Sequence, residues 1–258
     1  MLDPLWFHVP KPCPRAPLRL YCFPHAGGGA AAFRGWPELL GDAAEVVAVR
    51  LPGRENRFAE RRYRRMADVV AALVRALDSG LGRPFAFFGH SLGALVAFET
   101  ACALAAAGKP QPAHLIVAAS SAPGRSRASP PLHALPTDAL LTERLREFGG
   151  MPDEVLAQGP LLSLLLPTVR DDFEIGETYR HTAAEPLYQP VTALGGTRDR
   201  TVSEEELRAW RDVTAGPFGV RMLPGGHFFV REAPLLTAAC VVDALAAGPA
   251  AGRPGPRS

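Results

Sequence analysis

The stretch Gly89–Gly93 reads Gly-His-Ser-Leu-Gly and constrains the fold more than any other part of this chain. A buried strand is expected at Arg83–Phe88, directly before it, and a helix is expected directly after it. The pattern G-x-S-x-G between a strand and a helix is typical of a nucleophile elbow, a strained turn that exposes the serine hydroxyl. Gly89 and Gly93 remove side chains where strand and helix crowd together. The sequence therefore predicts that Ser91 is a nucleophile at the carboxyl end of a sheet strand.

Short apolar strands alternate with helical patterns along most of the chain. We expect strands at Leu18–Phe23, Glu45–Val49, Arg83–Phe88, His114–Ala119, Gln189–Leu194 and Gly219–Leu223. Apolar residues recur at helical spacing from Met66 to Leu77, which predicts a helix there. This alternation predicts an α/β fold in which helices cover both faces of a mostly parallel sheet. Ligands of such sheets bind outside the carboxyl ends of the strands.

The segment from Ser126 to Glu185 interrupts the alternation. Helical patterns are expected at Thr137–Phe148, Pro152–Leu156, Leu161–Leu166 and Thr168–Tyr179, with no convincing strand. Thr137 is a suitable N-cap residue for the first of them. An insertion of helices above the carboxyl edge of the sheet predicts a lid. A second apolar cluster without a gating role is the alternative.

Composition limits the classes of protein to consider. The 258 residues suffice for one large α/β domain, expected at residues 1–247, and the glycine- and proline-rich segment 248–258 is expected to be disordered. A net charge of +2 gives no general electrostatic case for nucleic acid. Neither a signal peptide nor a membrane-spanning apolar run is visible, so we expect a cytoplasmic protein that binds neither nucleic acid nor membrane. The four cysteines lack metal-ligand spacing, and no metal is expected.

Two residues near the end of the chain complete a catalytic triad with Ser91. A serine hydroxyl needs a base to accept its proton, and an acid that orients the base. In folds with this elbow, the chain order is serine, acid, histidine. His227 follows the last expected strand in a glycine-rich loop, and we predict that it is the base. Asp199 follows the preceding strand, and we predict that it holds the imidazole.

Other residues compete for the roles of base and acid. The rival histidines precede or adjoin the serine, begin a strand at the wrong edge, or lie in the insertion: His25, His90, His114, His133 and His181. The rival acids lie in the insertion, where a solvated helix face is the simpler interpretation: Asp171, Asp172 and Glu185. Asp199 has an alternative of its own, a surface salt bridge with Arg198 or Arg200.

A glycine-rich loop at Phe23–Gly29 follows the first strong strand. Hydrolases with a nucleophile elbow take one oxyanion donor from the residue after the nucleophile and the other from such a loop. We therefore predict that the backbone N–H groups of Leu92 and Ala26 form the oxyanion hole. The N–H of Gly27 is the alternative to that of Ala26.

The same loop has a second interpretation. Gly27–Ala32 fits G-x-G-x-x-A, the dinucleotide-binding pattern, and Arg50 at the end of the next strand could meet a 2′-phosphate. A nucleotide site gives no reason for Ser91, Asp199 and His227 to fall where they do. The catalytic interpretation is therefore the stronger one.

Five stretches of the chain resemble the type II thioesterases that accompany polyketide synthases and nonribosomal peptide synthetases. They are Phe23–Gly28, Leu51–Arg57, Phe88–Ala94, Leu166–Asp172 and Gly225–Phe228. The Leu-Pro-Gly-Arg run makes the combination specific, because hydrolase chemistry alone does not require it. The resemblance covers most of the chain, from about residue 18 to residue 242.

The resemblance implies an α/β-hydrolase fold with a helical lid. It also implies a stand-alone enzyme without a cofactor, which hydrolyses aberrant or stalled acyl groups from the phosphopantetheine arms of acyl or peptidyl carrier proteins. Small acyl thioesters would be further substrates. A general esterase or acyltransferase with the same triad, and a non-catalytic carrier-binding module, are the alternatives.

The resemblance does not decide the roles of two features of the chain. The leucines of Leu161–Leu166 would either line an acyl chamber or pack between lid helices. The basic run Arg57–Arg65 would either form a solvated face or dock an acidic carrier protein.

Overall fold

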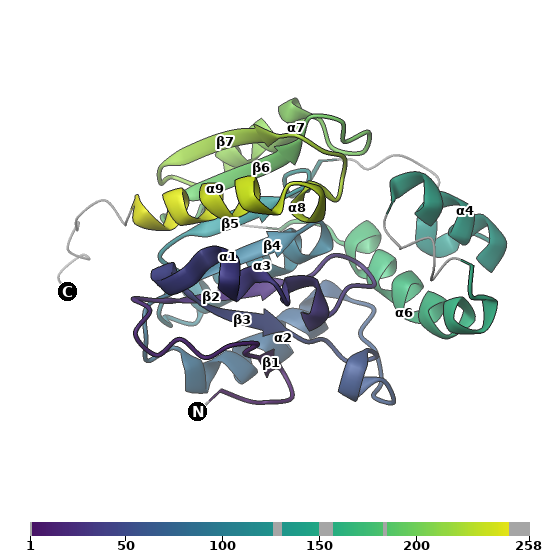
Figure 1. Cartoon of the computed structure of the whole chain (residues 1–258), viewed down its shortest axis with the longest axis horizontal. Helices are drawn as coiled ribbons and strands as arrows, with labels where there is room; N and C mark the ends of the chain where they lie inside the picture. The colour runs from purple at the N-terminus through teal and green to yellow at the C-terminus, as the bar shows by residue number, and fades with distance from the viewer. Residues whose placement is uncertain (1, 126–130, 150–156, 183–184, 248–258) are drawn as a thin grey trace.

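One mixed sheet organises the computed structural model, which describes residues 2–125, 131–149, 157–182 and 185–247 (Figure 1). In these residues, seven strands lie in the order β1-β3-β2-β4-β5-β6-β7. They are β1 (Phe7–His8), β2 (Arg19–Phe23), β3 (Glu45–Val49), β4 (Phe85–His90), β5 (Leu115–Ala118), β6 (Val191–Gly196) and β7 (Phe218–Leu223). β1 pairs antiparallel with β3, and the other neighbours are parallel. The predicted mostly parallel sheet is confirmed, and β1 is an element that the sequence analysis missed.

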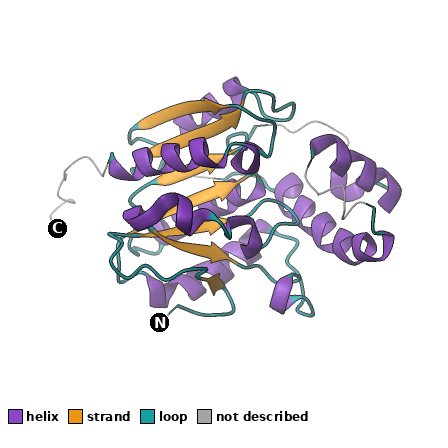
Figure 2. Ribbon diagram, viewed as in Figure 1, coloured by secondary structure: helices purple, strands orange, loops and turns teal. Residues whose placement is uncertain are grey.

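Helices cover both faces of the sheet (Figure 2). α2 (Met66–Leu77) and α3 (Leu92–Ala106) pack on one face, and α1 (Trp36–Leu40) and α9 (Pro234–Ala246) pack on the other. α7 (Glu204–Arg208) and α8 (Phe229–Glu232) are short. Turns of 3₁₀ helix occur at Ala30–Phe33, Gly41–Ala43, Glu55–Arg57, Asp78–Gly80, Leu132–Ala134 and Ala209–Val213. Within the described residues, no helix combines the length and the apolar character needed to span a bilayer.

β4 and α3 form the buried centre that carries Ser91. All six residues of β4 are buried. Phe87 faces the α2–α3 side and Phe88 faces the α1–α9 side, as the alternation of side chains along a strand requires. Ten of the fifteen residues of α3 are buried, because this helix is apolar around its whole circumference. The serine therefore lies between a fully buried strand and a mostly buried helix.

The turn between β4 and α3 works only with glycine on either side of it. A Cβ atom on Gly89 would lie 2.3 Å from the Gly93 carbonyl oxygen, and one on Gly93 would lie 2.2 Å from the Phe23 carbonyl oxygen. Ser91 itself has φ of 55°, a region that favours glycine. The predicted crowding of strand and helix is confirmed. Backbone contact on both sides holds the serine in this strained conformation.

The helical insertion lies beyond the carboxyl ends of the strands, where the arrowheads point in Figure 1. α4 (Asp138–Phe148) begins as predicted, and the Thr137 hydroxyl accepts a hydrogen bond from the Leu140 N–H at 3.2 Å. α6 (Gly159–Thr178) is one continuous helix, so the prediction of two helices separated at Pro167 is wrong. Pro167 removes one backbone hydrogen bond, but buried neighbours on both sides keep the helix in line. The helix predicted at 152–156 and the tail at 248–258 lie outside the described residues.

Replacing Gly89 by alanine should lower the free energy of unfolding by about 3 kcal/mol, because the new methyl group would meet backbone atoms that cannot rotate away. Urea unfolding monitored by circular dichroism measures this change. Gly82→Ala is the matched control, since a methyl group there would have no heavy atom of the described residues within 4 Å beyond its own chain neighbours. Equal effects of the two substitutions would contradict the crowding argument.

Candidate active site

Three side chains from three loops meet at the carboxyl edge of the sheet. Ser91 Oγ lies 3.0 Å from His227 Nε2, and His227 Nδ1 lies 2.9 Å from Asp199 Oδ2. An ionised carboxylate only accepts, so we assign the imidazole proton to Nδ1, which leaves the Nε2 lone pair facing the serine hydroxyl. The structure thus brings together the three residues that the sequence predicted for the triad.

Glycines after β6 and β7 allow the loops of the acid and the base to touch. A Cβ atom on Gly196 would lie 2.2 Å from the Gly226 carbonyl oxygen. The Arg198 N–H donates to the Gly225 carbonyl at 2.8 Å. Because Asp199 follows Gly196 and His227 follows Gly226 so closely, this contact between the two backbones fixes the separation of acid and base.

Asp199 is held ionised by several donors. Its side chain is fully buried, and Oδ1 accepts from the N–H and the hydroxyl of Thr201, each at 2.7 Å, and from the Val202 N–H at 3.2 Å. Burial opposes ionisation, but the hydrogen bonds from His227 and Thr201 outweigh it and lower the pKa of Asp199 below its ordinary value. The alternative of a salt bridge with Arg198 or Arg200 is wrong for Arg198, which pairs with Glu232.

Thr201 is a site residue that the sequence analysis missed. Its Oγ1 lies 2.8 Å from His227 Nδ1 as well as bonding Asp199, so it braces acid and base together. An aspartate whose side chain bonds the backbone two residues later is a common turn motif. The spacing Asp-x-Thr was therefore an available signal.

Two of the rival histidines support His227 rather than replace it. His90 Nε2 donates to the His227 carbonyl oxygen at 2.9 Å. Burial lowers the pKa of His90 well below its ordinary value, and burial lowers the pKa of His25 to about 4. The rings of His25, His90 and Phe228 pack edge to face against one another. The rings of His90 and Phe228 also pack against the imidazole of His227.

The geometry separates the candidate oxyanion donors. The Gly27 N–H donates to Asp172 Oδ2 at 2.7 Å, and the Ser91 N–H donates to the Ala118 carbonyl at 2.8 Å, so neither is free for a ligand. Among the described residues, no acceptor engages the N–H of Ala26 or of Leu92. Gly27 is therefore ruled out as the substitute donor, and Ala26 and Leu92 keep the predicted role.

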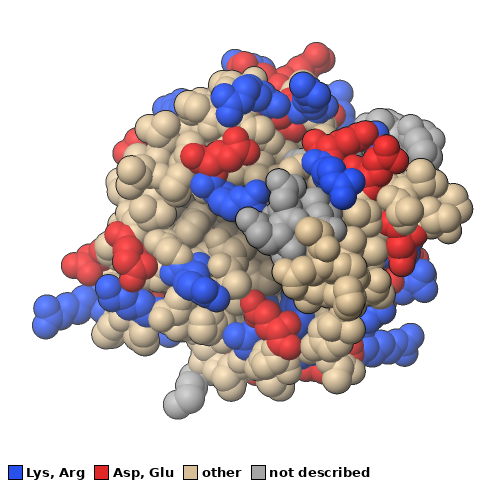
Figure 3. All heavy atoms as spheres, turned by 45° about the vertical axis from the view of Figure 1, so that its right-hand side comes forward, with Lys and Arg blue, Asp and Glu red and all other residues tan. Residues whose placement is uncertain are grey.

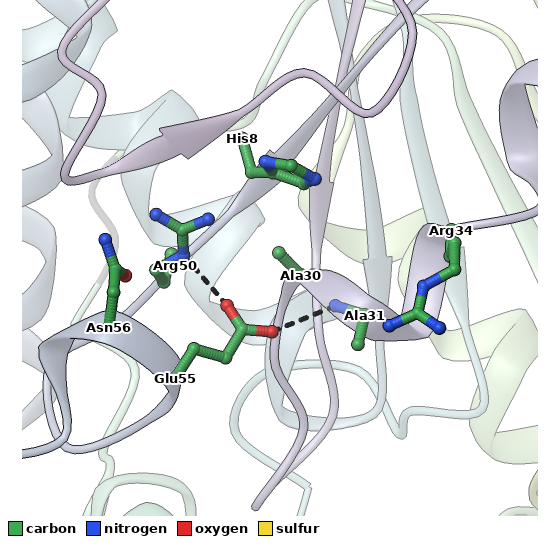
Figure 4. Close-up of a pocket in the computed structure, with 7 residues that line it drawn as sticks. All are labelled: His8, Ala30, Ala31, Arg34, Arg50, Glu55 and Asn56. Carbon is green, nitrogen blue, oxygen red and sulfur yellow. Dashed lines mark hydrogen bonds and ion pairs between the residues drawn. The ribbon is translucent and has the colours of Figure 1, made fainter.

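The dinucleotide interpretation of this loop is wrong. The chain after Gly29 forms only the four-residue 3₁₀ turn Ala30–Phe33, which is too short to offer a pyrophosphate a helix N-terminus. Arg50 Nε donates to Glu55 Oε2 at 2.8 Å, and Glu55 Oε1 accepts from the Ala31 N–H at 3.0 Å (Figure 4). This carboxylate points into a cavity of about 320 Å³ where a 2′-phosphate would have to lie.

Comparisons with known proteins identify the family of this chain. A family model described as thioesterase domain matches residues 18–240. The chain belongs to the thioesterase family. It is 39% identical over 227 residues to the gramicidin S biosynthesis protein GrsT of Aneurinibacillus migulanus, with 88% of each chain covered.

Solved structures show how fully this thioesterase shares the family fold. The RedJ thioesterase from the prodiginine biosynthetic pathway in Streptomyces coelicolor is 40% identical with a TM-score of 0.84, covering 88% of this chain and 90% of that one. The type II thioesterase BorB from the borrelidin biosynthetic cluster is 34% identical with a TM-score of 0.86, covering 95% and 99%. The predicted resemblance to type II thioesterases, the α/β-hydrolase fold and the assignment as a thioester hydrolase are confirmed.

Most of the basic run Arg57–Arg65 of the thioesterase is engaged within the chain. Arg57 is buried, pairs with Glu60 and lies over the Trp6 ring. Two further members pair with α6, Arg62 with Asp171 and Arg64 with both Asp171 and Glu174. Acidic and basic side chains are interspersed on the face that includes the insertion (Figure 3). Three of the five arginines of the run are therefore engaged in ion pairs, and docking by the run would fall mainly to the exposed Arg61 and Arg65.

Some leucines of the insertion are buried and others are exposed. Leu162 and Leu166 are buried in a small cluster with Val169 of α6 itself and with residues of α4 and of the 3₁₀ turn before it: Leu132, Leu141 and Leu145. Leu161 and Leu164 are exposed. The insertion therefore has an apolar cluster of its own, which is the feature expected under the alternative to a lid. Its gating role stays a prediction.

The neutral histidines predict how the stability of the thioesterase depends on pH. The pKa values of His25 and His90 lie below the ordinary value of 6.5, so the unfolded state binds more protons as the pH falls below about 6.5. The free energy of unfolding should therefore decrease as the pH is lowered from about 7 to about 4. His90→Gln can still donate to the His227 carbonyl and should make this decrease shallower in urea unfolding. His8→Gln, on the exposed side of β1, is the control, and equal slopes for all three proteins would contradict the assignment.

Proposed function

We propose that this thioesterase hydrolyses aberrant or stalled acyl groups from the phosphopantetheine arms of acyl or peptidyl carrier proteins. The observation that carries the proposal is the unbroken chain of hydrogen bonds from Ser91 through His227 to Asp199. It occurs in a chain that matches the thioesterase family over residues 18–240. The relatives from gramicidin S, prodiginine and borrelidin biosynthesis support the choice of carrier-bound substrates. Small acyl thioesters would react at the same site.

In the first half of the reaction, Ser91 becomes acylated. His227 Nε2 accepts the hydroxyl proton while Oγ attacks the thioester carbonyl carbon. The backbone N–H groups of Ala26 and Leu92 donate to the oxygen that becomes negative, and this stabilises the tetrahedral intermediate. The carbon–sulfur bond then breaks, and the departing sulfur takes the proton from His227 Nε2, which leaves the imidazole neutral for the second half. The departing pantetheine thiol, with a pKa of about 8.5, needs less help from an acid than an amine would.

In the second half, water releases the acid. His227 accepts a proton from water, and the resulting hydroxide attacks the acyl carbon on Ser91. The same two N–H groups donate to the acyl oxygen as it becomes negative. The proton then returns to Ser91 Oγ as the ester bond breaks. Asp199 stabilises the imidazolium in both halves and stays ionised. Nucleophile, base and oxyanion donors all come from the chain, so we propose that no metal or bound cofactor takes part.

Carrier unloading is the direct test. Incubating a hexanoyl-loaded carrier protein with the enzyme should remove the acyl mass from the carrier, as measured by intact-protein mass spectrometry. Ser91→Ala should abolish unloading, whereas the exposed Ser163→Ala on α6 should leave it unchanged. Unloading by Ser91→Ala at the wild-type rate would refute the mechanism. Faster cleavage of p-nitrophenyl esters than of any acyl-pantetheine would favour the general esterase instead.

Asp199→Asn should lower kcat by about 10⁴-fold, because an amide in this place favours the wrong imidazole tautomer. KM for hexanoyl-pantetheine should change little, since Asp199 is buried behind His227. Thiol release detected with a disulfide reagent gives both constants. Asp212→Asn, at an exposed aspartate paired with Arg125, is the matched control. A loss of less than tenfold would argue against the role of Asp199.

A further inference from the structure

Asp172 is a buried carboxylate of α6 that the triad does not use. The sequence analysis treated it as part of a solvated helix face, which is wrong, because the residue is only 2% exposed. Its two oxygens accept from both terminal nitrogens of Arg54, each at 2.8 Å. Oδ2 also accepts the Gly27 N–H at 2.7 Å. The carboxylate therefore joins α6 to the oxyanion loop Pro24–Gly29 and to the loop that carries Arg54.

The groups around the Ala26 N–H are fixed by a bond from Arg54 and by bonds within the loop itself. Arg54 Nη1 donates to the Gly28 carbonyl oxygen at 2.7 Å. His25 Nδ1 donates to the Ala26 carbonyl oxygen at 2.9 Å, and the Gly28 N–H donates to the His25 carbonyl oxygen at 2.9 Å. Within the described part of the chain, Asp172 thus completes a set of bonds that leaves the Ala26 N–H of this loop available to a ligand.

Packing reinforces the same arrangement. Gly27 has φ of 74°, and a Cβ atom there would lie 2.7 Å from Val169 Cγ2, so α6 rests directly on the loop. Thr168, the residue before Val169 on α6, donates from its hydroxyl to the Gly53 carbonyl oxygen at 2.9 Å, beside Arg54. A shift of α6 along or away from the sheet would therefore move Gly27 or break its bond to Asp172.

We infer that Asp172 and Arg54 are positioning residues that aim the Ala26 N–H at the developing oxyanion, so that catalytic competence depends on the seating of α6. The inference rests on the proposed function for the identity of the reaction. A buried ion pair adds little net stability compared with apolar side chains of the same volume. Charge-assisted hydrogen bonds do, however, fix geometry more firmly than neutral ones. We therefore expect this ion pair to fix the conformation of the oxyanion loop and to add little to the stability of the fold.

The test compares two neighbouring aspartates of α6. Asp172→Asn cannot accept from Gly27 and from both nitrogens of Arg54 at once, because one carboxylate oxygen becomes an NH₂ donor. With hexanoyl-N-acetylcysteamine, we expect kcat to fall by about 10- to 100-fold and KM to stay within about twofold, since small misplacement of catalytic groups costs this much. Asp171→Asn, which loses only the outer contacts to Arg62 and Arg64, should keep kcat within about twofold of wild type.

A pair of inhibitors separates positioning from general damage. Hexyl trifluoromethyl ketone forms a tetrahedral oxyanion on the serine, whereas the thioether analogue of the substrate forms none. Asp172→Asn should weaken binding of the ketone by the same factor as kcat/KM and leave binding of the thioether unchanged. Equal weakening of both, or identical kinetics for Asp171→Asn and Asp172→Asn, would overturn the inference.

A second variant covers the case in which Asp172→Asn does not fold. Arg54→Met combined with Asp172→Leu leaves no unpaired buried charge at this pair. It should retain a cooperative thermal transition yet show the same selective loss of ketone binding. Wild-type binding of the ketone by this double variant would overturn the inference.

Failure of the inference can be told apart from failure of the proposed function. If the wild-type enzyme cleaves p-nitrophenyl hexanoate but no acyl-pantetheine, the proposed substrate is wrong. The same variants and inhibitors then test the role of Asp172 and Arg54 on the ester.

Discussion

Direct backbone contact between α3 and the end of β2 is the constraint on which the site depends. Gly93 lies against the Phe23 carbonyl oxygen, where a methyl group would approach to 2.2 Å. Phe23 ends β2 and leads straight into the loop that carries Ala26, while α3 begins with Leu92. One contact therefore sets the position of Ser91 and of both candidate oxyanion donors. The acid and the base are then brought to this point by a similar contact between Gly196 and Gly226.

The sequence allowed most of the sheet and the triad to be predicted because both depend on local signals. Apolar runs of strand length recur between helical patterns, and parallel strands must all end at the same edge. Residues after β4, β6 and β7 were therefore expected at one edge of the sheet, and chain order then distinguished Asp199 and His227 from their rivals. The glycines beside them were visible in the sequence, although the contact between Gly196 and Gly226 was not.

The rest of the site could not be predicted because it depends on contacts between distant segments. Asp172 lies 118 positions from Arg54, and no periodicity in α6 distinguishes it from the partly exposed Asp171 beside it. The continuity of α6 through Pro167 depends on leucines that find partners in α4. The basic run before α2 is ambiguous for the same reason, since its partners Asp171 and Glu174 belong to another element.

The two sides of α6 make different kinds of contact, and this difference matters when insertions are exchanged between related thioesterases. The side that faces α4 belongs to a small apolar cluster of its own, and such clusters tolerate extensive repacking when volume is kept. The turn Thr168–Asp172 instead bonds or packs against the oxyanion loop and the Arg54 loop. A chimaera that grafts a foreign insertion onto this scaffold would therefore inherit a working hydrolase only if the graft preserved that single turn, whatever else it changed.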